Sequence, residues 1–272
     1  MATNPTGAIP NAVHGALQAS GFPFQTAVAD AIDRTAHWSV VASEWPWRDP
    51  ESGDQFLDLV AVCGRLSLAI ECKKTRNDIF TFLQPQLPPV PDVDRAYVIY
   101  SEQIRDMTRR LEVYSGVWGL GPLSAEAAFC VVSTGGAGRD QRLLERDAQR
   151  VVKATDAFAV SRAVAFQPTA EDEPRRPFVP VIVTNAQLFI ARYRPTDVAL
   201  DTGEFTQIPQ DITPVRWVRF RKSFAATRPD LGERTVLVVN SLSLLEFLAA
   251  AETIPREPQQ TGRRGHLPKP GG

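Results

Sequence analysis

The sequence predicts a mixed fold of the α/β or α+β class, with a mixed central β-sheet flanked by helices. Apolar side chains recur at helical spacing within residues 23–35 and 140–164. Apolar and β-branched runs over residues 54–62, 66–74 and 178–184 are typical of strands. The hydrophobic share of 43% and the charged share of 22% are ordinary for a globular protein. A chain of 272 residues is long enough to bury a substantial core.

Composition divides the chain into three parts. Residues 1–20 are small and polar and contain prolines, which predicts a loose N-terminal lead-in. Residues 21–254 are expected to form a single domain, and prolines 85, 88, 89 and 91 indicate an insertion or cap at about 76–128. Residues 255–272 are rich in proline, glycine and basic side chains, so we expect a disordered C-terminal tail.

Shorter patterns predict the remaining elements. Further strands are expected at residues 38–45, 95–100, 129–134, 188–193, 216–222 and 235–239, and shorter helices at 102–114 and 241–252. Because three residues separate the runs 178–184 and 188–193, they predict a hairpin, and Pro180 places the first run at a sheet edge or starts it late. Ser241 or Ser243 is the expected N-cap of the last helix.

Charge and cysteine content narrow the classes of function. The net charge of −1 lacks the basic excess of a protein that coats long nucleic acid, although an enzyme can carry a local basic groove. Cys63, Cys72 and Cys130 are widely spaced and form no disulfide framework or zinc motif. No signal peptide or membrane-length apolar run is recognisable, so we expect a cytoplasmic protein without a membrane partner.

A two-residue turn that begins at Gly64 carries the functional prediction. Glycine at the first central position suits a type II′ hairpin, in which Cys63 faces Leu66. Antiparallel pairing keeps the sum of partner numbers constant, so Asp58 is expected directly opposite Glu71. Residues that face each other in this way have Cβ atoms about 5 Å apart.

Two carboxylates this close in an apolar hairpin repel each other, and burying them costs more still. A divalent cation offsets both costs, because Mg²⁺ binds one or two carboxylates together with water and substrate phosphate. Lys73 lies two residues past Glu71 and shares its face of the strand. Its ammonium group could stabilise charge on a phosphate or orient an attacking water. Asp58, Glu71 and Lys73 are therefore the candidate catalytic residues, and Asp58 and Glu71 the candidate metal ligands.

This arrangement resembles the PD-(D/E)xK nuclease superfamily, whose signature is an acidic residue on one strand and Glu-x-Lys on the next. Asp58 supplies the first part, and Glu71-Cys72-Lys73 follows after an apolar run. The resemblance covers residues 21–75 well and 140–195 loosely, and it implies a restriction-endonuclease-like core.

Many members of this superfamily also carry a glutamate on the first helix, which is missing here. The resemblance leaves two candidates for that role, Gln25 on the helix and Glu44 on the first strand.

The resemblance implies a Mg²⁺-dependent nuclease that hydrolyses phosphodiester bonds of DNA or RNA, with Mn²⁺ able to substitute. Nucleic acid, DNA first, is then the expected partner, in DNA repair or in defence against foreign DNA. A homodimer or a protein partner could supply specificity. The alternative is a catalytically inactive nuclease-fold module that binds nucleic acid or a protein partner. The near-neutral charge and the missing helix glutamate favour this alternative, and the intact triad favours the enzyme.

Several polar residues allow two interpretations. Gln149 and Lys153 share a face of the long helix, where they either support the site by binding phosphate or form a solvated surface. Residues 216–222 interleave arginines with aromatics, which suits either single-stranded nucleic acid or a half-buried strand. Glu71 and Lys73 could also be ordinary ion-pairing residues of an edge hairpin, although the apolar run before Glu71 argues against it.

Overall fold

The structure of the chain is a computed structural model that describes residues 8–76, 78–86, 95–104, 110–119, 124–133, 143–164, 176–223 and 233–252. The helices are α1 (Ala8–Ala19), α2 (Phe22–Asp33), α3 (Leu143–Val164) and α4 (Leu244–Glu252). The strands are β1 (Ser39–Asp49), β2 (Gly53–Cys63), β3 (Leu66–Lys73), β4 (Ile79–Pro85), β5 (Arg95–Ile104), β6 (Arg110–Gly119), β7 (Ala125–Ala127), β8 (Phe129–Ser133), β9 (Arg176–Thr184), β10 (Gln187–Tyr193), β11 (Asp211–Pro214), β12 (Trp217–Lys222) and β13 (Arg234–Asn240).

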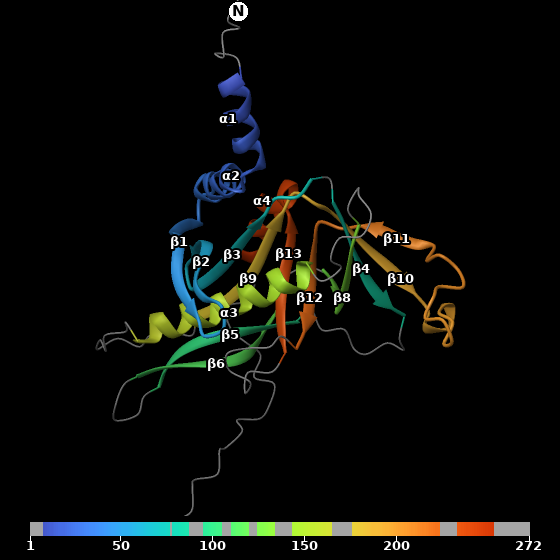
Figure 1. Cartoon of the computed structure of the whole chain (residues 1–272). Coiled ribbons are helices and arrows are strands. Elements are labelled where there is room, and N and C mark those ends of the chain that lie inside the picture. Colours follow the sequence, from blue (N-terminus) through green and yellow to red (C-terminus); the bar gives the residue numbers. More distant parts are fainter. Residues whose placement is uncertain are drawn as a thin grey trace, which may run out of the picture.

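These strands form two sheets, so the predicted mixed α and β class is confirmed (Figure 1). Within the described residues, nine strands make a large sheet in the order β1-β2-β3-β9-β13-β12-β7, and β5 joins it at β9 with β6 at its outer side. A second sheet has the order β11-β10-β4-β8. The large sheet is mixed, because β1, β2 and β3 pair antiparallel whereas β3, β9 and β13 run parallel.

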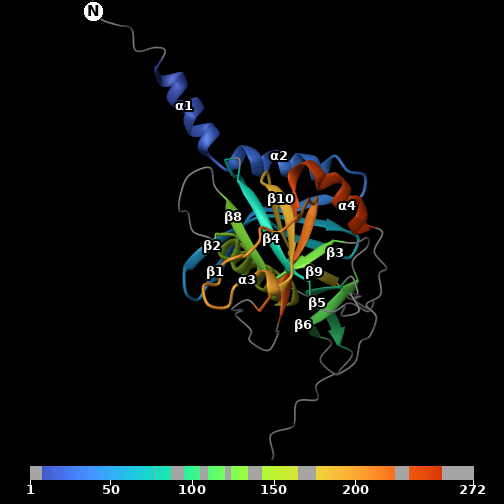
Figure 2. The same ribbon diagram turned by 90° about the vertical axis from the view of Figure 1, so that its right-hand side faces the viewer.

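Helices and the second sheet bury both faces of the large sheet. Helices α2 and α4 cover one face, where Ile32 and Phe247 pack in one cluster with Val181. Helix α3 and the second sheet lie on the other face, where Val151 and Phe82 share a cluster. Figures 1 and 2 show α3 crossing the strands on this face, while α1 projects away from the body of the protein. The site described below lies on the α3 side of the sheet.

The predicted hairpin between β2 and β3 is confirmed. A type II′ turn requires a positive φ at its first central residue only. Gly64 has a φ of 57°, and the φ of Arg65 is not positive. Cys63 pairs with Leu66, and the same register continues along both strands. The β2–β3 hairpin therefore has the register that the sequence predicts.

Two N-terminal segments are more regular than predicted. The lead-in expected over residues 1–20 contains helix α1, because Pro10 falls in its first turn, where proline is tolerated, and alanines follow. Strand β1 continues to Asp49, because the turn-rich residues after Trp45 pair with β2, as Pro46 does with Phe56.

The segment 76–128 is part of both sheets rather than a separate cap. The helix predicted at 102–114 is wrong, because β5 and β6 form an antiparallel ladder that extends from Arg95 opposite Gly119 to Ile104 opposite Arg110. β-Branched and aromatic residues in both strands favour this ladder. Strand β4 belongs to the second sheet, while β5 and β7 extend the large one.

The hairpin predicted for residues 178–193 is also wrong, because β9 and β10 belong to different sheets. Strand β9 is central rather than at an edge. Along one side it pairs continuously with β3, and on the other side its partner changes from β5 at Phe178 to β13 at Val181. Pro180 lies at this change of partner, and a proline is tolerated at such an irregularity because it lacks the N–H of a regular ladder.

The C-terminal helix begins differently from the prediction. Neither Ser241 nor Ser243 caps it; these residues form a 3-10 turn that precedes α4. The side chain of Asn240 caps the turn instead, because its Oδ1 accepts a hydrogen bond of 2.9 Å from the N–H of Leu242. The tail predicted at 255–272 lies outside the described residues.

Candidate metal and catalytic site

The site lies where β2 and β3 separate. Their ladder reaches the pair Leu59 and Ile70, one step before the predicted pair of Asp58 and Glu71. At that step a side chain replaces the backbone ladder, because Oδ2 of Asp58 accepts a hydrogen bond of 2.7 Å from the N–H of Cys72. The carboxylate is thus fixed at the point where the strands part.

A cleft with a volume of about 340 Å³ opens at this point between the start of α2, the β1–β2 hairpin and α3. The charged and amide side chains that line it are Gln25, Glu44, Asp54, Gln55, Asp58, Glu71 and Arg150. Four of these are carboxylates and one is a guanidinium, so the cleft carries an excess of negative charge. Such a cleft suits a cation.

Gln25 and Glu44, the two candidates for completing the site, both reach the cleft. Nε2 of Gln25 donates to Oε1 of Glu44 at 2.6 Å and to the carbonyl oxygen of Asp58 at 3.1 Å. Glu44 is the only described residue other than glycine with a positive φ, 50°, a conformation that costs energy for an L-residue. It lies between Ser43 and Trp45, which pair regularly with β2. The site therefore has a third carboxylate, supplied by a strained residue of β1.

Asp58 occupies an electrostatically unfavourable position. Burial is the largest influence and raises the pKa of its carboxyl group above the ordinary value of 3.8. The N–H of Cys72 and the charge of Arg150 act in the opposite direction and lower the pKa. The carboxylates of Glu44 and Asp147 raise it again. Because these influences leave the pKa raised, the ionised form of Asp58 would be stabilised by an additional positive charge.

Glu71 and Lys73 both point to α3, which confirms that they share a face of β3. Glu71 is 3% exposed and forms an ion pair through Oε1 with Nη2 of Arg150. Nζ of Lys73 lies 2.7 Å from Oδ2 of Asp147. Lys73 is near the cleft but is not one of the residues that line it. Strand β3 is central in the sheet, so the interpretation of these residues as parts of an exposed edge hairpin is wrong.

Lys153, a predicted supporting residue, does not line the cleft. Its ammonium lies 3.1 Å from Oδ2 of Asp49 and 2.8 Å from Oε2 of Glu51, at the far end of the β1–β2 hairpin. Burial alone would lower the pKa of Lys153, but the bonds to Glu51 and Asp49 outweigh it and raise the pKa. Gln149 is half-buried, and neither it nor Lys153 lines the cleft.

Two residues of α3 that contact Glu71 and Lys73 were not among the predicted site residues, Arg150 and Asp147. The available signal was a spacing of three, because Asp147, Arg150 and Lys153 follow one another at that interval. Residues three apart are neighbours on a helix, so charged residues that recur at this interval indicate a polar ridge along the helix. The spacing of four between Gln149 and Lys153 led to the wrong ridge.

The residues present fit Mg²⁺ better than a soft metal. Burial, followed by the charges of Asp58 and Glu44, raises the pKa of the Cys72 thiol, which keeps it protonated and unsuited to act as a nucleophile or thiolate ligand. In the described part of the chain no three His, Cys, Asp or Glu side chains gather into a complete metal site. Mg²⁺ needs only one or two carboxylates and takes water for its other positions. Asp58 and Glu71 would be those ligands.

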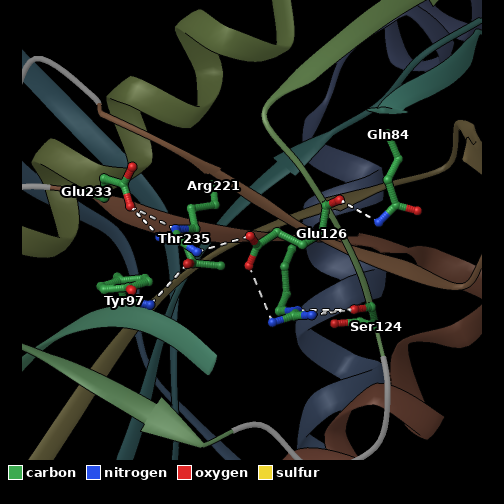
Figure 3. A network of polar contacts seen from close by, with 8 residues as sticks. Gln84, Tyr97, Ser124, Glu126, Arg221, Glu233 and Thr235 are labelled. Carbon is green, nitrogen blue, oxygen red and sulfur yellow. Dashed lines mark hydrogen bonds and ion pairs between the residues drawn. The ribbon is translucent and has the colours of Figure 1, made fainter. Parts of the chain in front are cut away.

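A second polar network lies near the opposite edge of the large sheet, around β7 and β12 (Figure 3). It decides between the two interpretations of residues 216–222. Arg219 is 1% exposed, and its Nε and Nη2 donate to the carbonyl oxygen of Ser124 at 3.1 and 2.9 Å. Arg221 bridges Glu126 at 3.1 Å and Glu233 at 2.6 Å. We call these five residues the Arg219 network.

Side-chain packing argues against the interpretation of this strand as a stacking surface for single-stranded nucleic acid, because the ring of Trp217 packs against Phe247. Phe220 is 0% exposed and cannot stack on a base. Arg221 lies over the ring of Tyr97, at 4.2 Å from the centroid, rather than facing an open groove. The half-buried strand is therefore the correct interpretation of residues 216–222.

Comparisons of the chain with protein-family models, curated proteins and solved structures found no match. The described helices include none of the length and apolar character needed to cross a membrane.

Proposed function

We propose that the chain is a divalent-cation-dependent nuclease with a restriction-endonuclease-like core, which hydrolyses phosphodiester bonds of DNA or RNA in the cleft. The observation that carries the proposal is the meeting of Asp58 and Glu71, from two strands, with Glu44 and Gln25 in one cleft. Apart from Asp54, which is exposed and pairs with Arg48, three carboxylates line this small space, and one arginine does not balance them.

Each residue has a definite task in this proposal. Asp58 and Glu71 would hold Mg²⁺ or Mn²⁺, which polarises a phosphodiester and lowers the pKa of a bound water. Asp58 is preorganised for this by the N–H of Cys72, and Gln25 fixes both the backbone of Asp58 and the side chain of Glu44. The ammonium of Lys73 would stabilise charge on the phosphate once it separates from Asp147.

A specific observation favours a second candidate, a non-catalytic module of the same fold. Glu71 and Lys73 are both engaged in ion pairs with α3. A chain in which these charges only attach the helix to the sheet would show the same pairs. In that case the chain would bind nucleic acid or a protein partner without cutting.

A cleavage assay separates the two candidates. The purified chain is incubated with Mg²⁺ or Mn²⁺ and with linear, nicked, branched and single-stranded DNA and RNA, and chelator is added to a parallel set. We expect cleavage of at least one substrate, lost with chelator and with Asp58→Asn. Asp30→Asn is the matched control, because Asp30 is an exposed residue of α2 that pairs with Arg34. Absence of cleavage of every substrate, or equal cleavage by Asp58→Asn, would overturn the enzyme proposal.

A further inference from the structure

Helix α3 presents a ridge of charged residues to the sheet. They are Asp147, Arg150, Lys153 and Asp156, spaced three apart. Such a ridge is inclined to the helix axis, so it crosses from one strand to another. Asp147 and Arg150 contact β3, and Lys153 contacts the β1–β2 hairpin.

The members of the ridge differ in how firmly they are held. Lys153 is 8% exposed in its side chain and lies between two carboxylates, those of Asp49 and Glu51. Arg150 is 41% exposed in its side chain, although its partner Glu71 is nearly fully buried. In addition, Nε of Arg150 has no hydrogen-bond partner among the described residues. A half-exposed guanidinium can move into water, but the buried carboxylate of Glu71 would then need another positive charge in its place.

The position of Arg150 conflicts with the proposed cation. A cation shared by Asp58 and Glu71 needs the carboxylate oxygens of Glu71, one of which Arg150 occupies. The guanidinium and the cation would also repel each other within one cleft. Both cannot bind Glu71 at full strength.

We propose that Arg150 is an exchangeable counter-ion, which neutralises Glu71 while no divalent cation is bound and is displaced when one binds. This inference rests on the proposed function and identifies the residue that sets the affinity for the cation. Lys153 keeps α3 attached to the hairpin during the exchange, so only the side chain of Arg150 has to move. Arg150 is a positioning residue in this scheme, because it acts through Glu71.

Calorimetric titration of the full chain with Mn²⁺ tests the exchange. Arg150→Met removes the competing charge and keeps much of the length of the side chain, so we expect the variant to bind Mn²⁺ about tenfold more tightly than the wild type. Arg150→Lys keeps the charge, and we expect an affinity between those of the wild type and Arg150→Met. Arg162→Met is the matched control, because Arg162 is an exposed residue in the last turn of the same helix. It should leave the affinity unchanged.

The outcomes distinguish the exchange from the proposed function. If Arg150→Met binds Mn²⁺ no more tightly than the wild type, the exchange is wrong and the nuclease proposal stands. If no variant binds the ion at all, both fail.

The variant leaves Glu71 without its partner, so its folding without a cation is checked by thermal unfolding in chelator and in Mn²⁺. A cation that binds the folded state raises the unfolding temperature. The exchange predicts a larger rise for Arg150→Met than for the wild type, and an equal or smaller rise would contradict it.

Discussion

Arginines form ion pairs with carboxylates in two regions of the large sheet, the cleft with Arg150 and the Arg219 network, and the two regions are built differently. In the Arg219 network the guanidinium of Arg219 is 1% exposed and makes two hydrogen bonds to a backbone carbonyl as well as approaching Glu126. In the cleft the side chain of Arg150 is 41% exposed and holds a single carboxylate. A buried arginine bonded to the backbone is part of the fold, whereas the exchange proposed for Arg150 requires a guanidinium that solvent reaches.

The strongest test of this comparison removes a carboxylate from the cleft. Asp58→Asn keeps the size of the side chain and an oxygen for the N–H of Cys72. We expect cleavage to fall about a thousandfold or more, because the lost charge would be a metal ligand. The free energy of unfolding should stay the same or rise, since burial disfavours the ionised Asp58. Cleavage rates and urea unfolding of the same preparations measure both quantities. A loss of stability with cleavage intact would reverse the comparison.

The converse change is made in the Arg219 network. Arg219→Met leaves the carbonyl of Ser124 without its buried partner, whereas Glu126 keeps its ion pair with Arg221. We expect the free energy of unfolding to fall by about 2–3 kcal/mol, while cleavage per folded molecule stays unchanged. Urea unfolding followed by circular dichroism measures the first quantity. A loss of cleavage at full stability would place this network in the site.

The attachment of α3 predicts a dependence of stability on pH. A hydrogen bond from the N–H of Glu51 is the largest influence on Asp49; together with Lys153 it outweighs burial and lowers the pKa of that carboxyl group below its ordinary value of 3.8. The unfolded chain therefore binds the proton more strongly than the folded chain. The contribution of Asp49 is present above 3.8 and is lost as the pH falls through the lower pKa of the folded state.

Urea unfolding above and below this pH checks the prediction. The wild type should lose more stability on acidification than Asp49→Asn, which has no carboxyl group to protonate at this position. Equal losses would show that the attachment of α3 does not depend on the charge of Asp49.

The smallest effect is expected for an exposed pair. Arg216 and Glu246 form an ion pair with both side chains more than half exposed. Arg216→Met should change the free energy of unfolding by only about 0–1 kcal/mol, because water screens the pair. Thermal unfolding of Arg216→Met and Arg219→Met compares the loss of stability at an exposed arginine, directly before β12, with the loss at a buried arginine within β12. A loss as large as that of Arg219→Met would mean that burial does not decide the contribution.

Local chemistry made part of this structure predictable. The turn at Gly64 and the pairing of Cys63 with Leu66 follow from rules that concern adjacent residues, and so does the face shared by Glu71 and Lys73. Helix α2 and strands β1, β2 and β3 were predicted for the same reason, although β1 extends further than expected.

Features that depend on distant segments were not predictable in this way. The partners of β9 come from β3, β5 and β13, so nothing close to Pro180 in sequence revealed that this strand is central. The rotation of α3 decides whether Arg150 or Gln149 enters the cleft, and packing against the sheet sets that rotation. The positive φ of Glu44 could not be predicted from the sequence, because glycine is the residue usually found in that conformation.

A crystal of the full chain soaked in Mn²⁺, measured at a wavelength where manganese scatters anomalously, would show directly whether the cleft binds a divalent cation. We expect an anomalous peak in contact with the carboxylates of Asp58 and Glu71, with Arg150 turned away from Glu71. A well-ordered cleft without a peak, or a peak that touches neither carboxylate, would contradict this expectation.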